Sequence, residues 1–99
     1  MAYQVVWSST AIEDVEAIAT YISRDSSAYA AAVVQKIVDV THNLSKFPFL
    51  GRVVPELNED SIREKFAYNY RIIYRIENEI ITISSVMHGK RILDIENDL

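Results

Sequence analysis

Cysteine is missing from this chain of 99 residues, and histidine occurs only at His42 and His88. Without cysteine the protein has no disulfide, no thiolate nucleophile and no cysteine-ligated zinc or iron–sulfur cluster. Two histidines are too few for a site that needs three imidazoles, although carboxylates can in principle complete such a site. We therefore expect the protein to hold no metal and no cofactor.

Long apolar runs are missing as well. No run approaches the ~18 residues that span a membrane, and the first residues lack the basic start and hydrophobic stretch of a signal peptide. We expect a soluble, cytoplasmic protein with no membrane partner. Apolar residues make up 49% of the chain and charged residues 24%, which is the balance of a globular domain. At this length we expect a single domain over residues 1–99, with a surface groove rather than a deep cavity as its site.

Charge is unevenly distributed along the chain. The formal net charge is −4, from 10 basic and 14 acidic side chains. Residues 1–60 carry a local −4, residues 61–91 a local +3, and the tail over residues 92–99 a further −3. A basic stretch therefore lies inside an acidic protein, and this partition matters more for the choice of partner than the total does.

The first part of the chain predicts a strand followed by a helix. Large apolar residues alternate over residues 3–7, which is the period of a half-buried strand. Thr10 and Glu13 then have capping-box spacing, and a helix is expected from there to about residue 24. Its apolar positions, three and four residues apart, form one stripe that we expect to face the core. The stripe consists of Ile12, Val15, Ile18, Ala19 and Ile22.

A second helix follows after a very short turn. Ser26 and Ser27 offer a new N-cap, and helical spacing of apolar residues continues to about Lys46. We expect a helical hairpin over about 10–46. Both prolines lie in the next segment, which predicts a loop over residues 47–60.

From about residue 61 to 88 the period changes to two, which predicts strands. A strand over residues 62–66 precedes a β-hairpin whose turn is Glu77–Glu79. The fold class expected is α+β: an N-terminal strand, a two-helix hairpin, then a three-stranded antiparallel sheet with the helices packed on one face. If Tyr70 and Tyr74 turn toward the helices, Arg71 and Arg75 point to the other face, which we expect to be free to bind a partner.

Four features in this order resemble the RelE/ParE superfamily of bacterial toxins. They are Trp7, the loop Phe47–Glu56, the run Tyr70–Arg75 and the ending Met87–Arg91, and the match covers about residues 3–91. The resemblance implies a growth-arresting toxin of a type II toxin–antitoxin module, neutralised by a cognate antitoxin that wraps a segment over its surface. RelE-like members cleave messenger RNA on the ribosome, whereas ParE-like members poison DNA gyrase. Fold alone does not decide between these activities.

The ParE-like branch is favoured by the long helical hairpin, the Pro-Phe-Leu-Gly-Arg loop and the His-Gly-Lys-Arg ending. Many members of that branch are known only as plasmid-stabilisation homologues. In this interpretation the protein acts by binding a protein such as DNA gyrase. The side chains expected to bind partners are Arg52, Arg71, Arg75, His88 and Arg91. A homodimer, or an inactive homologue that only binds its antitoxin, stays open as an alternative.

The other alternative is a RelE-like, metal-independent endoribonuclease. Such an enzyme needs cations on the phosphate and an acid–base pair. Arg71 and Arg91 resemble its phosphate-stabilising arginines, Arg63 and Lys65 resemble its paired strand lysines, and His88 is the expected general acid or base, as in some related nucleases. The C-terminal tyrosine of that branch is absent, and a net negative charge disfavours binding to RNA.

Each of these residues also has a structural explanation. Arg71 and Arg75 fit an exposed, salt-bridged sheet face, and a lone histidine such as His88 is more often hydrogen-bonded than catalytic. Tyr70 and Tyr74 have the spacing of core residues that pack against the helices.

Overall fold

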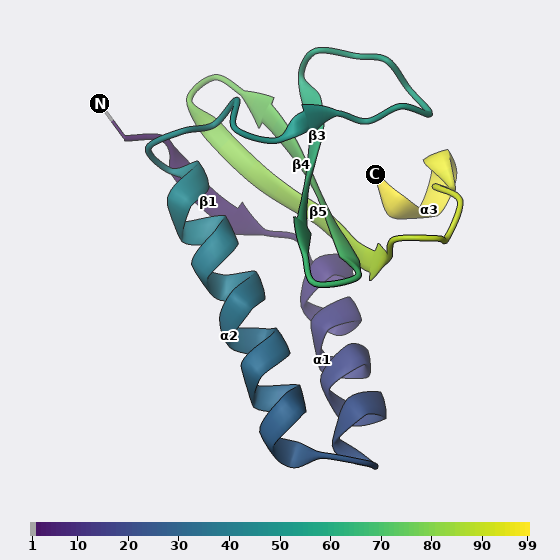
Figure 1. Ribbon diagram of the computed structural model, residues 1–99. Coiled ribbons are helices and arrows are strands. Elements are labelled where there is room, and N and C mark those ends of the chain that lie inside the picture. The colour runs from purple at the N-terminus through teal and green to yellow at the C-terminus, as the bar shows by residue number, and fades with distance from the viewer. Residues whose placement is uncertain (1) are drawn as a thin grey trace.

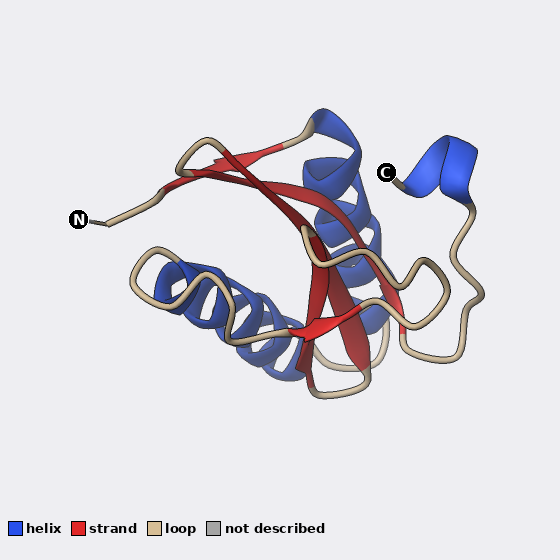
Figure 2. Cartoon of the chain, turned by 90° about the horizontal axis from the view of Figure 1, so that it is seen from above, coloured by secondary structure: helices blue, strands red, loops and turns tan. Residues whose placement is uncertain are grey.

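The computed structural model describes residues 2–99 and has a mixed sheet with two long helices on one face (Figures 1 and 2). The elements in chain order are β1 (Gln4–Trp7), α1 (Ser9–Ser23), α2 (Ser27–Leu44), β2 (Arg52–Val53), β3 (Ile62–Ala67), β4 (Tyr70–Glu77), β5 (Ile80–His88) and α3 (Ile95–Asp98). Figure 1 shows α1 and α2 side by side as a hairpin, with the yellow α3 apart from them. Within residues 2–99, no helix combines the length and the apolar character needed to cross a membrane.

The sheet has five strands, and its antiparallel part has four strands instead of the three expected. Its order is β1-β5-β4-β3-β2; β1 runs parallel to β5, and the other pairs are antiparallel. The N-terminal strand therefore joins the sheet, and Arg52–Val53 of the expected loop adds a further strand opposite Arg63 and Glu64. A strand of two residues has no period to detect, so only its pairing with β3 reveals it.

The first helix starts two residues earlier than its capping box suggested. The N-cap is Ser8, whose Oγ accepts a hydrogen bond from the Ala11 amide at 3.0 Å, so the expected Thr10 cap is wrong. Ala11 is buried, whereas Ile12 is 48% exposed and drops out of the core stripe. Ser26 is the N-cap of α2, as expected, and accepts from the amide of Tyr29.

A bulge in β5 changes which side chains face the helices. Ile73 lies opposite Ser85 but Tyr74 lies opposite Ile83, so Ser84 is an extra residue in β5. The period of two expected for about residues 61–88 therefore fails after Ile83. Val86 joins the core under the helices because a bulge shifts the parity of a strand by one residue.

Two apolar cores lie on the two faces of the sheet. The larger one is formed by α1, α2 and the helix-facing side chains of β4 and β5. The smaller one contains Val54, Ile62, Ile73, Met87 and Leu93. The second face is thus covered by the segment after β2 and by the C-terminal segment, and the expectation that it is free is wrong. Neither segment has a regular period, so the sequence pattern did not show that it packs against the sheet.

Candidate functional site

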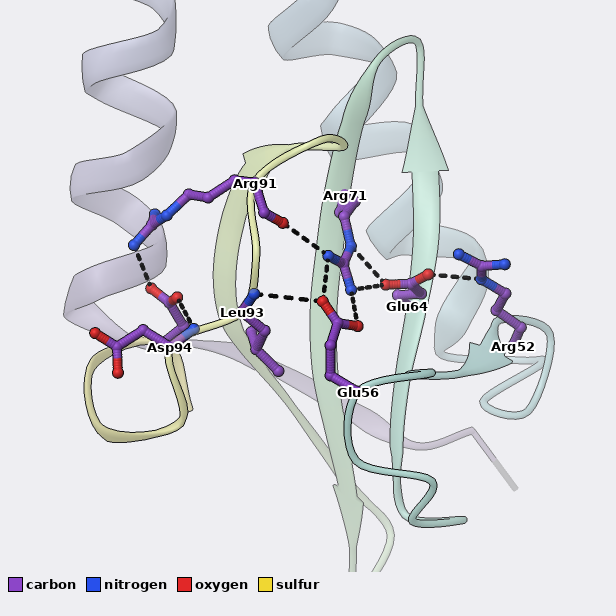
Figure 3. A network of polar contacts seen from close by, with 8 residues as sticks. Arg52, Glu56, Glu64, Arg71, Arg91, Leu93 and Asp94 are labelled. Atoms are coloured by element: carbon purple, nitrogen blue, oxygen red, sulfur yellow. Dashed lines mark hydrogen bonds and ion pairs between the residues drawn. The ribbon is translucent and has the colours of Figure 1, made fainter.

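Arg71 is the centre of the polar network on this second face (Figure 3). It projects from β4 and is only 4% exposed. Its Nε donates to Oε1 of Glu64 at 2.7 Å, and Nη2 forms an ion pair with the same oxygen. Nη1 and Nη2 donate to the two carboxylate oxygens of Glu56 at 2.9 and 2.8 Å. Nη1 also donates to the carbonyl oxygen of Arg91 at 3.1 Å.

These contacts engage all three nitrogens of the guanidinium. Four of its five N–H groups donate hydrogen bonds, and Nη2 also forms the ion pair with Glu64. A phosphate or a partner carboxylate could bind Arg71 only after Glu56 or Glu64 had been displaced. The guanidinium is therefore closed to outside ligands in this conformation.

Glu64 is the buried carboxylate of the network. Its side chain has no exposed surface and lies between Arg71 and Arg52, whose Nε donates to Oε2 at 2.6 Å. A buried carboxylate is costly unless it is paired and hydrogen-bonded, and here both oxygens have a cationic partner. Arg52 remains largely exposed on the outer side of the network.

Glu56 connects the segment after β2 to the C-terminal segment. Hydrogen bonds from Arg71 hold the pKa of Glu56 down at about 2, against an ordinary 4.5. Its Oε2 also accepts from the amide of Leu93 at 3.3 Å. Further along, Arg91 Nη2 pairs with Asp98 at 3.1 Å, and Asp98 accepts from the amide of Asp94 at 2.8 Å. The network thus fastens both covering segments to the sheet.

Arg63 and Lys65 lie on the other face of β3 from Glu64, because side chains alternate along a strand. Arg63 donates to the Asp60 carboxylate at 2.6 Å and to the carbonyl oxygen of Gly51 at 3.0 Å. The four cations of the ribonuclease interpretation are therefore not brought together around one point. The structure places Arg71 and the Arg91 backbone in the network, and Arg63 and Lys65 away from it.

His88 and Arg91 lie at a second place, beside α1. His88 is exposed at the end of β5, its Nδ1 accepts from the amide of Lys90 at 3.2 Å, and its ring meets that of Tyr70 edge-on at 5.8 Å. Together with Asp14 and Arg91 it borders a hollow of about 340 Å³ between α1 and the end of the sheet. Burial raises the pKa of Asp14, whose Oδ2 accepts from the amide of Val86 at 2.9 Å.

Arg75 is the remaining expected partner-binding residue, and it lies apart from the Arg71 network and from His88. It is exposed near the far end of β4, opposite Ile62 on one neighbouring strand and Thr82 on the other. Within residues 2–99 it forms no ion pair by the 4.0 Å distance criterion. Of the five expected partner-binding residues, Arg52, Arg75, His88 and Arg91 therefore keep exposed side chains, whereas Arg71 does not.

Sequence reasoning missed Glu56 and Glu64 as the partners of Arg71. Glu64 stands between two cations in a strand, where its charge suggests an exposed position. Glu56 follows Pro55 in an irregular segment. The signal in the sequence was a set of arginines on one expected sheet face. Such a set predicts carboxylate partners but does not identify them.

The comparisons with known proteins identify the family. The family model described as ParE toxin of type II toxin–antitoxin system, parDE, matches residues 5–93. A solved structure titled chromosomal ParDE TA system from P. aeruginosa is similar, with a TM-score of 0.73, 20% identity, and coverage of 90% of this chain and 98% of that one. The structure of the toxin–antitoxin complex RelBE2 from Mycobacterium tuberculosis is also similar, with a TM-score of 0.62 and 25% identity. The match covers 89% of this chain and 99% of that one. No curated protein sequence matches the chain.

Proposed function

This chain belongs to the ParE family of type II toxin–antitoxin toxins, and from that premise we propose that it arrests growth by binding DNA gyrase and is neutralised by a cognate antitoxin. The proposal includes action in the cytoplasm and a role in stabilising the plasmid that carries the module. Two similar structures are titled as toxin–antitoxin systems or complexes, which supports an antitoxin as partner.

The closed Arg71 network is the observation that favours a protein-binding function and disfavours a nuclease function. A metal-independent nuclease needs free cations to stabilise the charge on the phosphate in the transition state. All three guanidinium nitrogens of Arg71 are engaged, and Arg63 is committed to Asp60 and to a backbone carbonyl. The net charge of −4 also disfavours the general attraction to phosphate on which RNA binding depends.

A supercoiling assay with purified gyrase tests the proposal. We expect micromolar toxin to block the conversion of relaxed plasmid to the supercoiled form. Arg75→Glu and His88→Ala change exposed groups of the expected partner-binding set, and we expect at least one of them to weaken inhibition. Lys36→Glu, on the exposed side of α2, is the matched charge control and should inhibit as the parent does.

Two results would contradict the proposal. Undisturbed supercoiling at micromolar toxin would remove gyrase as the target. Cleaved messenger RNA in cells that express the chain, with cleavage lost in a folded Arg91→Ala variant, would instead establish the nuclease function.

A further inference from the structure

A second surface, which adjoins the closed network at Arg52 and Glu64, lies around Phe66 at the end of β3. We call it the Phe66 surface and define it by Leu50, Arg52, Lys65, Phe66, Tyr68 and Lys90. Phe66 lines two hollows. One of about 290 Å³ is lined by Leu50, Arg52, Glu64, Lys65 and Phe66. The other, of about 440 Å³, is lined by Phe66, Tyr68, Asn69, His88, Gly89 and Lys90.

The hollow beside Leu50 exists because β2 is short. Strand β2 pairs with β3 only at Arg63 and Glu64, so no strand of the described chain continues beside Lys65 and Phe66. The apolar side chains there stay exposed: Leu50 at 51%, Phe66 at 42% and Tyr68 at 53%. Large apolar side chains that gather around hollows on a surface are typical of a protein-binding site.

The loop that supplies Leu50 is fixed from beneath. The buried Tyr74 hydroxyl donates to the carbonyl oxygen of Pro48 at 2.8 Å and accepts from the amide of Gly51 at 2.9 Å. Arg63 adds a hydrogen bond to the carbonyl oxygen of Gly51. Leu50 is therefore held between anchored residues, which lowers the entropy lost when a partner binds.

The charges at this surface are positive although the protein is acidic. Arg52 uses only its Nε on Glu64, so the two Nη groups of this 62% exposed side chain have donors to offer. Lys65 and Lys90 form no ion pair within residues 2–99 by the 4.0 Å distance criterion. Glu64 is the one carboxylate that lines either hollow, and it is buried and paired with both Arg52 and Arg71.

We infer that the Phe66 surface binds a segment of another protein in which carboxylates alternate with large apolar side chains. The apolar side chains would enter the two hollows beside Phe66, and the carboxylates would pair with Arg52, Lys65 and Lys90. Nucleic acid fits less well, because the hollow beside Leu50 is edged by two apolar side chains and the total charge is −4. The inference rests on the proposed protein-binding function for the class of partner only.

The test measures binding to the full chain without gyrase. An isotope-labelled sample is titrated with a synthetic peptide that alternates glutamate with leucine and phenylalanine, and amide shifts are followed by NMR. We expect saturable binding, with shifts concentrated at Leu50, Arg52, Lys65, Phe66 and Lys90. The same peptide with glutamine for glutamate should bind at least tenfold more weakly, because it lacks the charges that the surface complements.

Matched variants test whether peptide binding depends on the Phe66 surface or on another part of the molecule. Phe66→Ala and Lys65→Glu should each weaken peptide binding at least tenfold. Tyr21→Ala and Lys36→Glu, which change an exposed aromatic and an exposed cation on the two helices, should bind as the parent does. Circular dichroism and thermal unfolding verify that each variant is folded.

Four outcomes would overturn the inference: no binding, shifts confined to another face, equal binding of the glutamine peptide, or tighter binding of single-stranded oligouridylate. Concentration-dependent dimerisation that Phe66→Ala abolishes, seen by sedimentation, would assign the surface to a second copy of this chain instead. Because gyrase is not in the assay, a failure here is distinct from a failure of the supercoiling test.

Discussion

At the residue scale, Arg71 is the side chain on which the second face depends. Arg71→Ala would leave Glu64 buried beside a single cation and Glu56 without one. We expect a loss of about 3–5 kcal/mol in the free energy of unfolding, since breaking a buried pair leaves an uncompensated charge. Urea denaturation followed by circular dichroism measures it.

Arg75→Ala is the matched control, because Arg75 lies on the same strand and is exposed. We expect its effect to stay within about 0.5 kcal/mol, as for surface substitutions in general. A loss below about 1 kcal/mol for Arg71→Ala would contradict the structural role of the network, because a truncated buried pair costs more than that.

For the residues of β4, the sequence pattern predicted the direction of each side chain but not what covers it. Alternation along β4 correctly separated Tyr70 and Tyr74 from Arg71, and the tyrosines do contact the core under the helices. It placed Arg71 on the opposite face but wrongly left that face open. Alternation tells which face a side chain takes and says nothing of what covers that face.

At the element scale, the loop before β2 depends on a close approach at Gly51. A methyl group there would overlap the carbonyl oxygen of Glu64 and lie 2.6 Å from the Tyr74 hydroxyl. The backbone of Gly51 has no positive φ, so the cost of a side chain is steric alone. We expect Gly51→Ala to lower the free energy of unfolding by about 2 kcal/mol, as overpacking does.

Gly89→Ala serves as the comparison for this prediction. Its new methyl would meet the Asn69 carbonyl and the Phe66 ring at 3.0 Å, and the exposed ring can move. Thermal or urea unfolding of both variants should give the larger loss for Gly51→Ala. Equal losses, or none, would mean that the loop adjusts without breaking its tether to Tyr74.

Elements with a clear period were predictable, and short ones were not. The helical hairpin and the strands β3, β4 and β5 follow from spacing, and Ser26 caps α2 as expected. β2 and α3 were not predicted, because two and four residues are too short to establish a period. The bulge at Ser84 was not predicted from the sequence either, because an extra residue is defined only by the pairing with the neighbouring strand.

At the scale of the whole molecule, stability should fall in acid. The pKa of Glu56 is lowered to about 2 by the Arg71 hydrogen bonds, and that of Asp94 is lowered by hydrogen bonding to Asn97. A lowered carboxyl pKa contributes stability that is complete above the unfolded value and is lost as pH falls toward the folded value. For Glu56 this window runs from its ordinary 4.5 down to about 2.

Burial raises the pKa of Asp14, which contributes in the opposite direction, so the Glu56 contribution is best isolated by difference. Glu56→Gln should be less stable than the parent at neutral pH, and its stability should fall less steeply between pH 4.5 and about 2. Urea unfolding across this range measures both slopes. Parallel slopes for the two proteins would show that the Glu56 carboxylate is not linked to folding.

By itself the sequence determined the α+β order, the helical hairpin, the core side of β4 and the membership of a toxin family, because local periodicity and motif order record these. Only the tertiary structure decided which cations are free. The ions that close the Arg71 network lie 7 and 15 residues from it in the chain, and the carbonyl that completes it lies 20 away. Such pairs form when irregular segments pack over a sheet face, and no local pattern encodes that packing. The basic stretch of the sequence is thus divided between Arg63 and Arg71, which the fold uses, and exposed cations, of which Lys65 and Lys90 lie around Phe66.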